Sequence, residues 1–302
     1  MTDVISIRDL DKPTIEKLLE SAEKMEKNLF TSHEMFRGKV AATLFFEAST
    51  RTHLSFQTAA QRLGMSIVPY YHNASSSTKG ESLRDTIRIV DGYADILVMR
   101  HPQEGAARYA AEQAQHPVVN AGDGGNQHPT QTLIDLYAIL KAKGKIKGLN
   151  VQLVGDLKHA RAMRSLLYAL GMFGATVKLA APVGLEMDPA IIKETEEKFG
   201  AKITQTADLD LSGSDVVYVC RIQKERFADP YAASKLAASF RISPELLKNA
   251  KSDMILMHPL PKIDEIPPEV DNSPHAYYFQ QARCGVPVRM AVLAYCMKGK
   301  VD

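Results

Sequence analysis

Short apolar runs alternate with amphipathic stretches along this chain. The apolar runs predict buried strands at Val40–Phe46, Ile96–Met99, Val118–Val119, Val151–Val154, Thr176–Ala180, Val216–Cys220 and Met254–Met257. Stretches with apolar residues three and four positions apart predict helices at Ile15–Leu29, Leu54–Leu63, Glu81–Val90, Thr130–Leu140, Met163–Phe173, Ile191–Phe199 and Val288–Met297. This alternation is typical of a parallel sheet with helices on both faces.

The elements fall into two sets, which predicts an α/β fold of two doubly wound domains. Each would be a mostly parallel sheet flanked by helices, with the active site in the interdomain cleft. The basic, glycine-containing segment KAKGKIKGLN at 141–150 is the expected boundary. We therefore expect domains at 1–140 and 141–287, with the C-terminal helix at 288–302 packed back on the first. The length of 302 residues agrees with about 150 residues per domain.

Composition excludes several classes of protein. Apolar residues make up 45% and charged residues 24%, as in ordinary globular proteins. A net charge of +2 gives no general attraction to nucleic acid or to a membrane surface. There is no apolar run long enough to span a bilayer and no signal-peptide pattern, so we expect a cytoplasmic protein. Cys220, Cys284 and Cys296 have neither disulfide-framework nor zinc-site spacing.

Polar residues follow the predicted strands, where ligands bind in open α/β sheets. Ser49-Thr50-Arg51-Thr52 comes after the first strand and Arg100 after the second. Free N–H groups at a helix start, two hydroxyls and a guanidinium suit a phosphate dianion. The same residues also fit a capped helix start with an exposed arginine, and the spacing alone does not separate the two interpretations.

Other polar residues at strand ends are individually ambiguous. His128 precedes Pro129 at a helix start and could donate to a carbonyl oxygen, or simply cap the helix. Arg161 could bind a carboxylate, or be a solvent-exposed charge on a helix. Lys79 could be a cation that extends to a ligand, or an ordinary loop residue. The Gly155 turn lacks the GxGxxG pattern, and no P-loop, GxSxG or HExxH motif occurs. Dinucleotide, P-loop, serine-hydrolase and zinc-protease chemistries are therefore disfavoured.

Taken together, the motifs give the chain a specific resemblance over its whole length. It resembles the aspartate/ornithine carbamoyltransferase family. The motifs that carry the resemblance stand in the family's order: Phe45–Thr52 (FFEASTRT), Met99–Pro102 (MRHP), His128–Gln131 (HPTQ), Gly155–Lys158 (GDLK), Arg221–Arg226 (RIQKER) and His258–Pro261 (HPLP).

The resemblance implies three groups of site residues. Those implied to bind the carbamoyl phosphate are Ser49, Thr50, Arg51, Thr52, Arg100, His128 and Gln131. Those implied to bind aspartate are Arg161, Arg221, Gln223, Leu260 and Pro261, with a cis peptide bond between the last two. Ser75 and Lys79 are implied to reach aspartate in a neighbouring subunit's site. Lys79 follows Thr78 where the family often has a second lysine, so we expect it to carry this role alone.

The implied function is transfer of the carbamoyl group from carbamoyl phosphate to the α-amine of L-aspartate. The products would be N-carbamoyl-L-aspartate, in pyrimidine biosynthesis, and phosphate. Attack would be direct, with Thr52, Arg100 and His128 stabilising the oxyanion and no covalent enzyme intermediate. The resemblance implies no cofactor and no metal. It implies a homotrimer with shared active sites, and leaves open whether regulatory chains join trimers into an allosteric assembly.

Two alternatives stay open at this point. Ornithine carbamoyltransferases share the phosphate motif but usually carry Ser-Met-Gly and His-Cys-Leu-Pro, which this sequence lacks. The other alternative is a non-catalytic relative with the same fold, since fold alone does not guarantee activity. Such a relative is expected to have lost some of its polar ligands, whereas every implied position is filled here.

Overall fold

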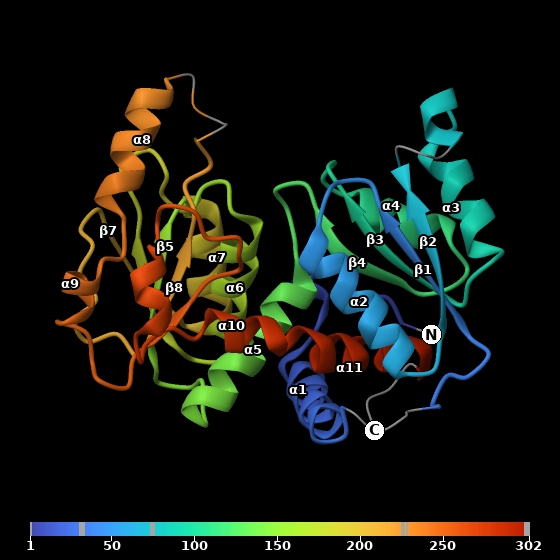
Figure 1. Ribbon diagram of the computed structural model, residues 1–302, viewed down its shortest axis with the longest axis horizontal. Coiled ribbons are helices and arrows are strands. Elements are labelled where there is room, and N and C mark those ends of the chain that lie inside the picture. Colours follow the sequence, from blue (N-terminus) through green and yellow to red (C-terminus); the bar gives the residue numbers. More distant parts are fainter. Residues whose placement is uncertain (1, 30–33, 73–75, 225–226, 228, 299–302) are drawn as a thin grey trace. The chain divides into compact units, whose positions relative to one another are not determined.

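The chain folds into two compact units in a computed structural model that describes residues 2–29, 34–72, 76–224, 227 and 229–298. Unit 1 comprises Met1–Tyr137 and Cys284–Asp302, and unit 2 comprises Ala138–Arg283 (Figure 1). Each unit has its own parallel sheet and its own hydrophobic core. We describe them one at a time.

Unit 1 is built on a four-stranded parallel sheet with the strand order β2-β1-β3-β4. Its strands are β1 (Val40–Phe45), β2 (Ser66–Tyr71), β3 (Ile96–His101) and β4 (Val118–Asp123). Its helices are α1 (Lys12–Lys27), α2 (Thr50–Arg62), α3 (Leu83–Asp91), α4 (Ala106–Gln113), most of α5 (Pro129–Lys143) and α11 (Gly285–Lys298), with short 3-10 helices η1 (Ile7–Asp9) and η3 (Ser76–Lys79). The segment around Val4 bridges β4 in parallel at Val119 and so extends the sheet at that edge.

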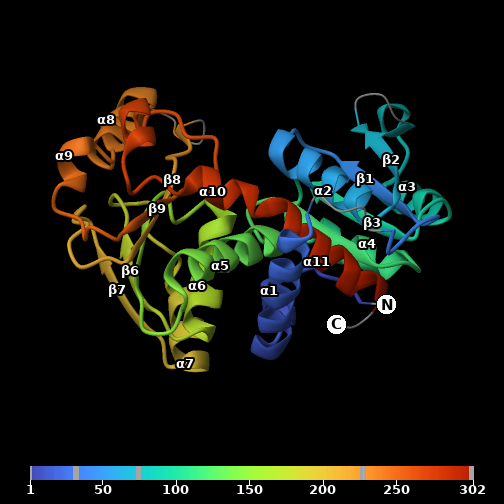
Figure 2. The same ribbon diagram turned by 60° about the horizontal axis from the view of Figure 1, so that its bottom comes forward.

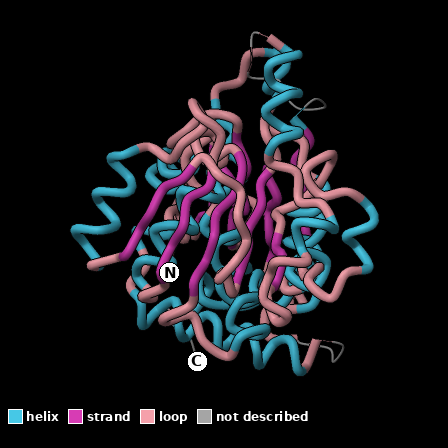
Figure 3. The backbone as a smooth tube through the Cα atoms, turned by 90° about the vertical axis from the view of Figure 1, so that its left-hand side faces the viewer, coloured by secondary structure: helices cyan, strands magenta, loops and turns pink. Residues whose placement is uncertain are grey.

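Unit 2 is built on a five-stranded parallel sheet with the order β7-β6-β5-β8-β9. Its strands are β5 (Asn150–Gly155), β6 (Thr176–Ala180), β7 (Lys202–Thr206), β8 (Val216–Cys220) and β9 (Ile255–Met257). Its helices are α6 (Arg161–Met172), α7 (Pro189–Phe199), α8 (Pro230–Ser239), α9 (Pro244–Leu247) and α10 (Tyr278–Arg283), with the 3-10 helix η5 (Pro268–Asn272). Figure 3, seen from the side of this unit, shows its strands in a row with helices on both sides.

Most of the strands are apolar because helices cover both faces of a parallel sheet. Every residue of β4, β8 and β9 is buried, as are all but the first of β1 and of β5. The predicted fold class, two doubly wound parallel-sheet domains, is therefore confirmed. All seven predicted strands and all seven predicted helices are present, and all but β6 and β8 have shifted ends.

Sequence patterning missed β2 and β7, each of which forms one edge of its sheet. Both are largely exposed or half-buried along their length, so neither carries a continuous apolar run. The short helices α4, α8, α9 and α10 were also missed. Strands β3 and β4 were predicted too short, because their last residues are polar and nevertheless paired within the sheet. Arg100 therefore lies on β3, and not after it as predicted.

The division into units falls inside α5, between Tyr137 and Ala138, shortly before the basic segment at 141–150. The helix runs on to Lys143, and Lys141 and Lys143 lie in its last turn, where positive charge is favourable. At the other end of the chain, α11 belongs to unit 1, where it packs against α1 and α2 (Figure 2). It begins at Gly285, three residues before the predicted start, and residues 299–302 lie outside the described part.

Two findings limit the chemistry of the described residues. None of the helices within the described ranges is long and apolar enough to cross a membrane. No cluster of three or more metal-ligating side chains is found in the same ranges. The three cysteines are free and buried, and burial raises the pKa of the Cys220 and Cys296 thiols.

Candidate active site

Each sheet has one point at which its strand order reverses, and ligands bind there in doubly wound folds. In unit 1 this point lies between β1 and β3, and in unit 2 between β5 and β8. The Ser49–Thr52 segment follows β1, and Arg100 lies near the end of β3. In unit 2, Asp156 follows β5 and Arg221 follows β8. Polar residues predicted from the sequence therefore lie at or near the strand ends at both switch points.

The start of α2 forms the first part of the unit 1 site. Ser49 is the N-cap residue, with extended backbone, but its hydroxyl makes no capping hydrogen bond. Thr50, Arg51 and Thr52 form the first turn, where backbone N–H groups have no partner within the helix. Arg51 is exposed and Thr52 is buried. The turn therefore offers hydroxyl, guanidinium and amide donors to an anion at the helix start.

Arg100 brings a second cation to the same edge of the sheet. Its backbone carbonyl accepts a hydrogen bond of 2.8 Å from Phe46 N–H, which ties the end of β3 to the segment after β1. Its side chain is mostly buried, and Nε lies 2.7 Å from Oε1 of Glu47. A bound anion at the start of α2 would therefore compete with the Glu47 carboxylate for this guanidinium.

His128 and Gln131 lie at the start of α5, which begins at Pro129 as predicted. His128 is buried, and its carbonyl accepts hydrogen bonds from the backbone N–H groups of Gln131 and Thr132. The Gln131 amide Nε2 donates to Oδ1 of Asp135, one helical turn on, at 2.9 Å. Since this bond fixes the amide nitrogen, the Gln131 oxygen is the group left to accept from a ligand N–H.

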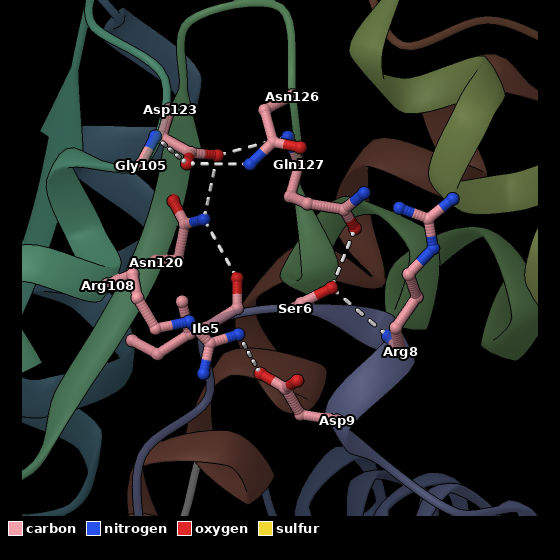
Figure 4. Close-up of polar contacts among 10 residues, drawn as sticks. All are labelled: Ile5, Ser6, Arg8, Asp9, Gly105, Arg108, Asn120, Asp123, Asn126 and Gln127. Atoms are coloured by element: carbon pink, nitrogen blue, oxygen red, sulfur yellow. Dashed lines mark hydrogen bonds and ion pairs between the residues drawn. The ribbon is translucent and has the colours of Figure 1, made fainter.

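A buried hydrogen-bond network fixes the segment that leads to His128 (Figure 4). Asp123, at the end of β4, is only 1% exposed. Its carboxylate accepts from the backbone N–H groups of Gly105 and Gln127, each at 3.0 Å, and from the amides of Asn120 and Asn126 at 3.0 and 3.1 Å. Four donors on one carboxylate hold the turn between β4 and α5 in a single conformation.

The network also reaches the N-terminal segment. Ser6 Oγ donates to Gln127 Oε1 at 3.1 Å, and the Asn120 amide donates to the Ile5 carbonyl at 2.9 Å. At the tip of the turn, Gly124 has φ +51, and a Cβ there would overlap Glu104. The position of His128 thus depends on several residues that do not touch the phosphate-binding segment.

Replacing Asp123 by Ala should destabilise unit 1 by roughly 2–4 kcal/mol, because buried donors lose their acceptor together. Asp9→Ala is the matched control, since Asp9 in the same region only pairs with Arg108 at an exposed site. Loss of an exposed pair is expected to cost about 1 kcal/mol or less. Denaturant unfolding of both variants measures the difference. Equal midpoints for the two variants would contradict the role given to Asp123.

In unit 2, Asp156 ties the ends of β5 and β8 together. Its side chain is fully buried and accepts from His159 N–H at 3.0 Å and from Gln223 N–H at 3.4 Å. The His159 ring nitrogen Nδ1 lies 3.0 Å from the same carboxylate. Gly155 has φ +112, and a Cβ there would overlap the Cys220 carbonyl, so only glycine lets the two strand ends approach this closely. The turn carrying Arg221 and Gln223 is thereby anchored.

Arg221 lines a cavity of about 200 Å³ in unit 2. The remaining lining residues include Ile222 and Phe240, which are apolar, and Lys224, which pairs with Asp264 at 2.8 Å. Arg161 is the first residue of α6, and its side chain is half-buried. Arg161 lies at the start of α6 and Arg221 follows β8. Guanidinium groups of this kind suit the binding of carboxylate groups.

The Leu260–Pro261 peptide bond is cis, as the resemblance implied. The backbone N–H of Leu260 donates to Nδ1 of His258 at 2.8 Å. His258 Nε2 lies 2.9 Å from the Glu265 carboxylate, and its backbone N–H donates to Gln281 at 2.9 Å. Burial alone would raise the pKa of Glu265, but hydrogen bonds from His258 and from the backbone outweigh it and lower that pKa. His258 is therefore a buried support for the Leu260 backbone.

The sequence-predicted residues thus fall into two sets. The unit 1 set comprises Ser49, Thr50, Arg51, Thr52, Arg100, His128 and Gln131. The unit 2 set comprises Arg161, Arg221, Gln223, Leu260 and Pro261. Lys79 is exposed at the end of η3 in unit 1, and Ser75 lies outside the described residues.

Sequence reasoning missed the groups that hold these residues: the half-buried Glu47 and the buried Asp123, Asp135, Asp156 and Glu265. Asp135 could have been found, since it lies four residues after Gln131 on the same helix face. Asp156 could also have been found, because it directly follows an apolar strand. Glu47 contacts Arg100 from a distant segment, whereas Asp123 and Glu265 contact residues nearby in irregular turns.

These features define an α/β protein of two parallel-sheet domains, each with basic side chains at its switch point. The family models for the aspartate/ornithine carbamoyltransferase carbamoyl-P binding domain and Asp/Orn binding domain match residues 2–141 and 147–296. The chain belongs to the aspartate/ornithine carbamoyltransferase family.

Several relatives are similar over nearly their whole length. An aspartate carbamoyltransferase catalytic subunit from Thermococcus gammatolerans is 53% identical over 296 residues, which is 96% of each chain. The catalytic subunit of M. jannaschii aspartate transcarbamoylase has a TM-score of 0.92 at 46% identity, covering 99% of both chains. Trypanosoma cruzi aspartate transcarbamoylase in complex with carbamoyl phosphate and aspartate has a TM-score of 0.91 at 39% identity, covering 97% of this chain and 95% of that one.

Proposed function

We propose that this chain is an aspartate carbamoyltransferase catalytic subunit. It transfers the carbamoyl group of carbamoyl phosphate to the α-amine of L-aspartate, giving N-carbamoyl-L-aspartate and phosphate. The observation that carries the proposal is the convergence of Arg51, Thr52 and Arg100 on the switch point of unit 1. Relatives with this name, similar over nearly the whole chain, support it.

Unit 1 binds carbamoyl phosphate in this proposal. The phosphate lies at the start of α2, where the free N–H groups, the Ser49, Thr50 and Thr52 hydroxyls and the Arg51 guanidinium donate to its oxygens. Arg100 leaves Glu47 to contact the same ligand. Gln131 accepts from the carbamoyl amide, because Asp135 already holds its nitrogen. His128 donates to the carbamoyl oxygen.

Unit 2 binds aspartate. Arg161 and Arg221 are cations that suit the two carboxylates of the substrate, and Gln223 and the backbone of the cis Leu260–Pro261 segment add polar contacts. The cationic side chain of ornithine would be repelled by the same arginines. This charge pattern, together with the absence of Ser-Met-Gly, favours aspartate as the acceptor over ornithine.

The chemistry is direct acyl transfer. The neutral α-amine attacks the carbonyl carbon, and the carbonyl electron pair moves to oxygen to form a tetrahedral oxyanion. Donors from Thr52, Arg100 and His128 stabilise that oxyanion, and each such donor typically contributes 10²–10³-fold in rate. The oxyanion then collapses, the C–O bond to phosphate breaks, and the leaving phosphate takes a proton from the nitrogen. No protein nucleophile and no cofactor is required, and holding both substrates in register supplies much of the remaining acceleration.

We further propose a homotrimer in which Ser75 and Lys79 of one chain serve the aspartate site of its neighbour. The relatives are described as catalytic subunits, which is compatible with assembly into a larger complex. The exposed position of Lys79 leaves it accessible to another chain. In this proposal the enzyme acts in the cytoplasm, in the synthesis of pyrimidines.

Mixing two inactive variants tests the shared site. Arg51→Ala and Lys79→Ala chains should each form poorly active trimers. Reassembly of an equal mixture should restore about one quarter of the sites, since each site takes the two residues from different chains. Mixing Arg51→Ala chains with Arg51→Ala/Lys79→Ala chains is the control and should restore nothing. Activity that does not recover in the first mixture would contradict shared sites.

Product analysis tests the reaction itself. The purified chain is given carbamoyl phosphate with either L-aspartate or L-ornithine, and the carbamoylated products are separated and quantified. The proposal predicts N-carbamoyl-L-aspartate and no citrulline. Citrulline as the main product would make the chain an ornithine carbamoyltransferase, and binding of both substrates without turnover would make it a non-catalytic relative.

A further inference from the structure

Arg289 is a buried arginine in α11, far in sequence from every residue discussed for the phosphate site. It is only 4% exposed. A buried guanidinium is costly unless its charge and its donors are satisfied. The groups of unit 1 that surround Arg289 therefore decide whether its charge and its donors are satisfied.

Its first contact is with the helix that starts the phosphate site. Arg289 Nη1 donates to Ser55 Oγ at 2.5 Å, and the guanidinium carbon lies 4.8 Å from the centre of the Phe56 ring. The Ser55 hydroxyl in turn lies 2.5 Å from the Arg51 carbonyl and 3.1 Å from the Thr52 carbonyl. Arg289 is thus connected through one hydroxyl to the backbone of the first turn of α2.

The charged groups acting on Arg289 come from two other elements. Burial and, after it, the charge of Arg100 on β3 together lower the pKa of Arg289 to about 9, although Asp135 on α5 acts in the opposite direction. At neutral pH the guanidinium is still protonated. Asp135 is the residue that holds the Gln131 amide. The positive charge therefore lies among the elements that carry Arg51, Arg100 and Gln131.

The backbone of α11 leaves room for this arrangement. Gly285 lies one turn before Arg289, and a Cβ at that position would come within 2.9 Å of Arg289 Nη1. Glycine at the first position of α11 therefore leaves room for the guanidinium in the position that it occupies.

We propose that Arg289 is a positioning residue for carbamoyl phosphate. It braces the first turn of α2 through Ser55 and adds a buried positive charge behind the phosphate-binding groups, without touching the substrate. A bound dianion lowers the cost of keeping Arg289 and Arg100 charged near one another. This deepens the proposed function, on which it rests for the identity of the substrate.

Binding of inorganic phosphate tests the role of the charge without requiring turnover. Arg289→Met has a similar length and no charge, and should weaken phosphate binding about tenfold. Arg289→Lys keeps the charge and should lose less than threefold. Lys298→Met is the matched control, because it removes one charge from the exposed end of the same helix, and it should bind phosphate as the unaltered chain does. Calorimetric titration of the assembled full-length protein gives all three affinities.

Steady-state kinetics separate a positioning role from a merely structural one, because a positioning role changes the KM for one substrate and not for the other. In Arg289→Met the KM for carbamoyl phosphate should rise about tenfold, while the KM for aspartate stays within about twofold. Ser55→Ala tests the brace alone and should raise the KM for carbamoyl phosphate several-fold with the charge intact. If Arg289→Met fails to fold, as judged by circular dichroism, Ser55→Ala still tests the proposal.

The proposal is overturned if Arg289→Met binds phosphate as tightly as Lys298→Met does. It is also overturned if Arg289→Lys loses as much affinity as Arg289→Met, or if Ser55→Ala leaves phosphate affinity and kinetics unchanged. Failure of the proposed function is distinguishable. In that case the unaltered chain shows no carbamoyl transfer, while the phosphate titrations still report on Arg289.

Discussion

Arg51→Ala should lower kcat by about 10³-fold and leave the fold intact. Arg51 is exposed on the first turn of α2, so its removal costs no core packing. In the proposed site its guanidinium contacts the phosphate that must depart, where negative charge develops as the C–O bond breaks. Removing one donor to such a charge typically costs 10²–10³-fold, and loss of a full positive charge lies at the upper end.

Arg37→Ala is the matched control for this experiment. Arg37 is an arginine of the same unit, 79% exposed and paired only with Glu34. Steady-state rates at saturating substrates, with thermal unfolding of each variant, separate catalysis from stability. If Arg51→Ala kept activity within a few-fold of that of Arg37→Ala, the assignment of the phosphate site to α2 would be wrong.

Arg221→Ala should reduce kcat/KM for aspartate by about 10²–10⁴-fold while changing the KM for carbamoyl phosphate little. A carboxylate held by an arginine gains two charge-assisted hydrogen bonds of about 1.5–3 kcal/mol each. The turn carrying Arg221 is anchored independently by Asp156 and by Cys220, whose thiol donates to the Asp156 carbonyl at 3.3 Å. The side chain can therefore be removed without unfolding the turn.

The control here is Arg241→Ala, since Arg241 is exposed in the same unit and follows α8. Initial rates with each substrate varied in turn give the two KM values. A variant in which carbamoyl phosphate and aspartate were affected equally would show that Arg221 supports the site as a whole. That result would contradict its assignment to the acceptor.

The central strands could be predicted from sequence because they are buried on both faces. VVYVC at β8 and TVKLA at β6 were predicted to the residue, whereas SIVPYY at β2 and KITQT at β7 were missed as edge strands. The ends of β3 and β4 were misplaced for a different reason. Arg100 and Asn120 are polar, yet ladder pairing and buried hydrogen bonds keep them in the sheet.

For the site, sequence reasoning supplied the groups that face a ligand but not the groups that hold them. Arg51, His128 and Arg221 lie directly after apolar strands or at helix starts, positions that local pattern reveals. Their supports come from elsewhere in the chain. Ser55 is braced by Arg289, 234 residues away, and the Arg100 guanidinium pairs with Glu47, from the segment that follows another strand. Such pairs have no local signature, because the fold alone brings them together.

In the proposed function, the cations of unit 1 bind carbamoyl phosphate and those of unit 2 bind aspartate. N-(phosphonacetyl)-L-aspartic acid, the compound bound in a Trypanosoma cruzi aspartate transcarbamoylase, carries both a phosphonate and an aspartate moiety in a single molecule. Calorimetric titration with this compound should give one site per chain, and Arg51→Ala and Arg221→Ala should each weaken binding by at least 10²-fold. Unchanged affinity in either variant would contradict the account.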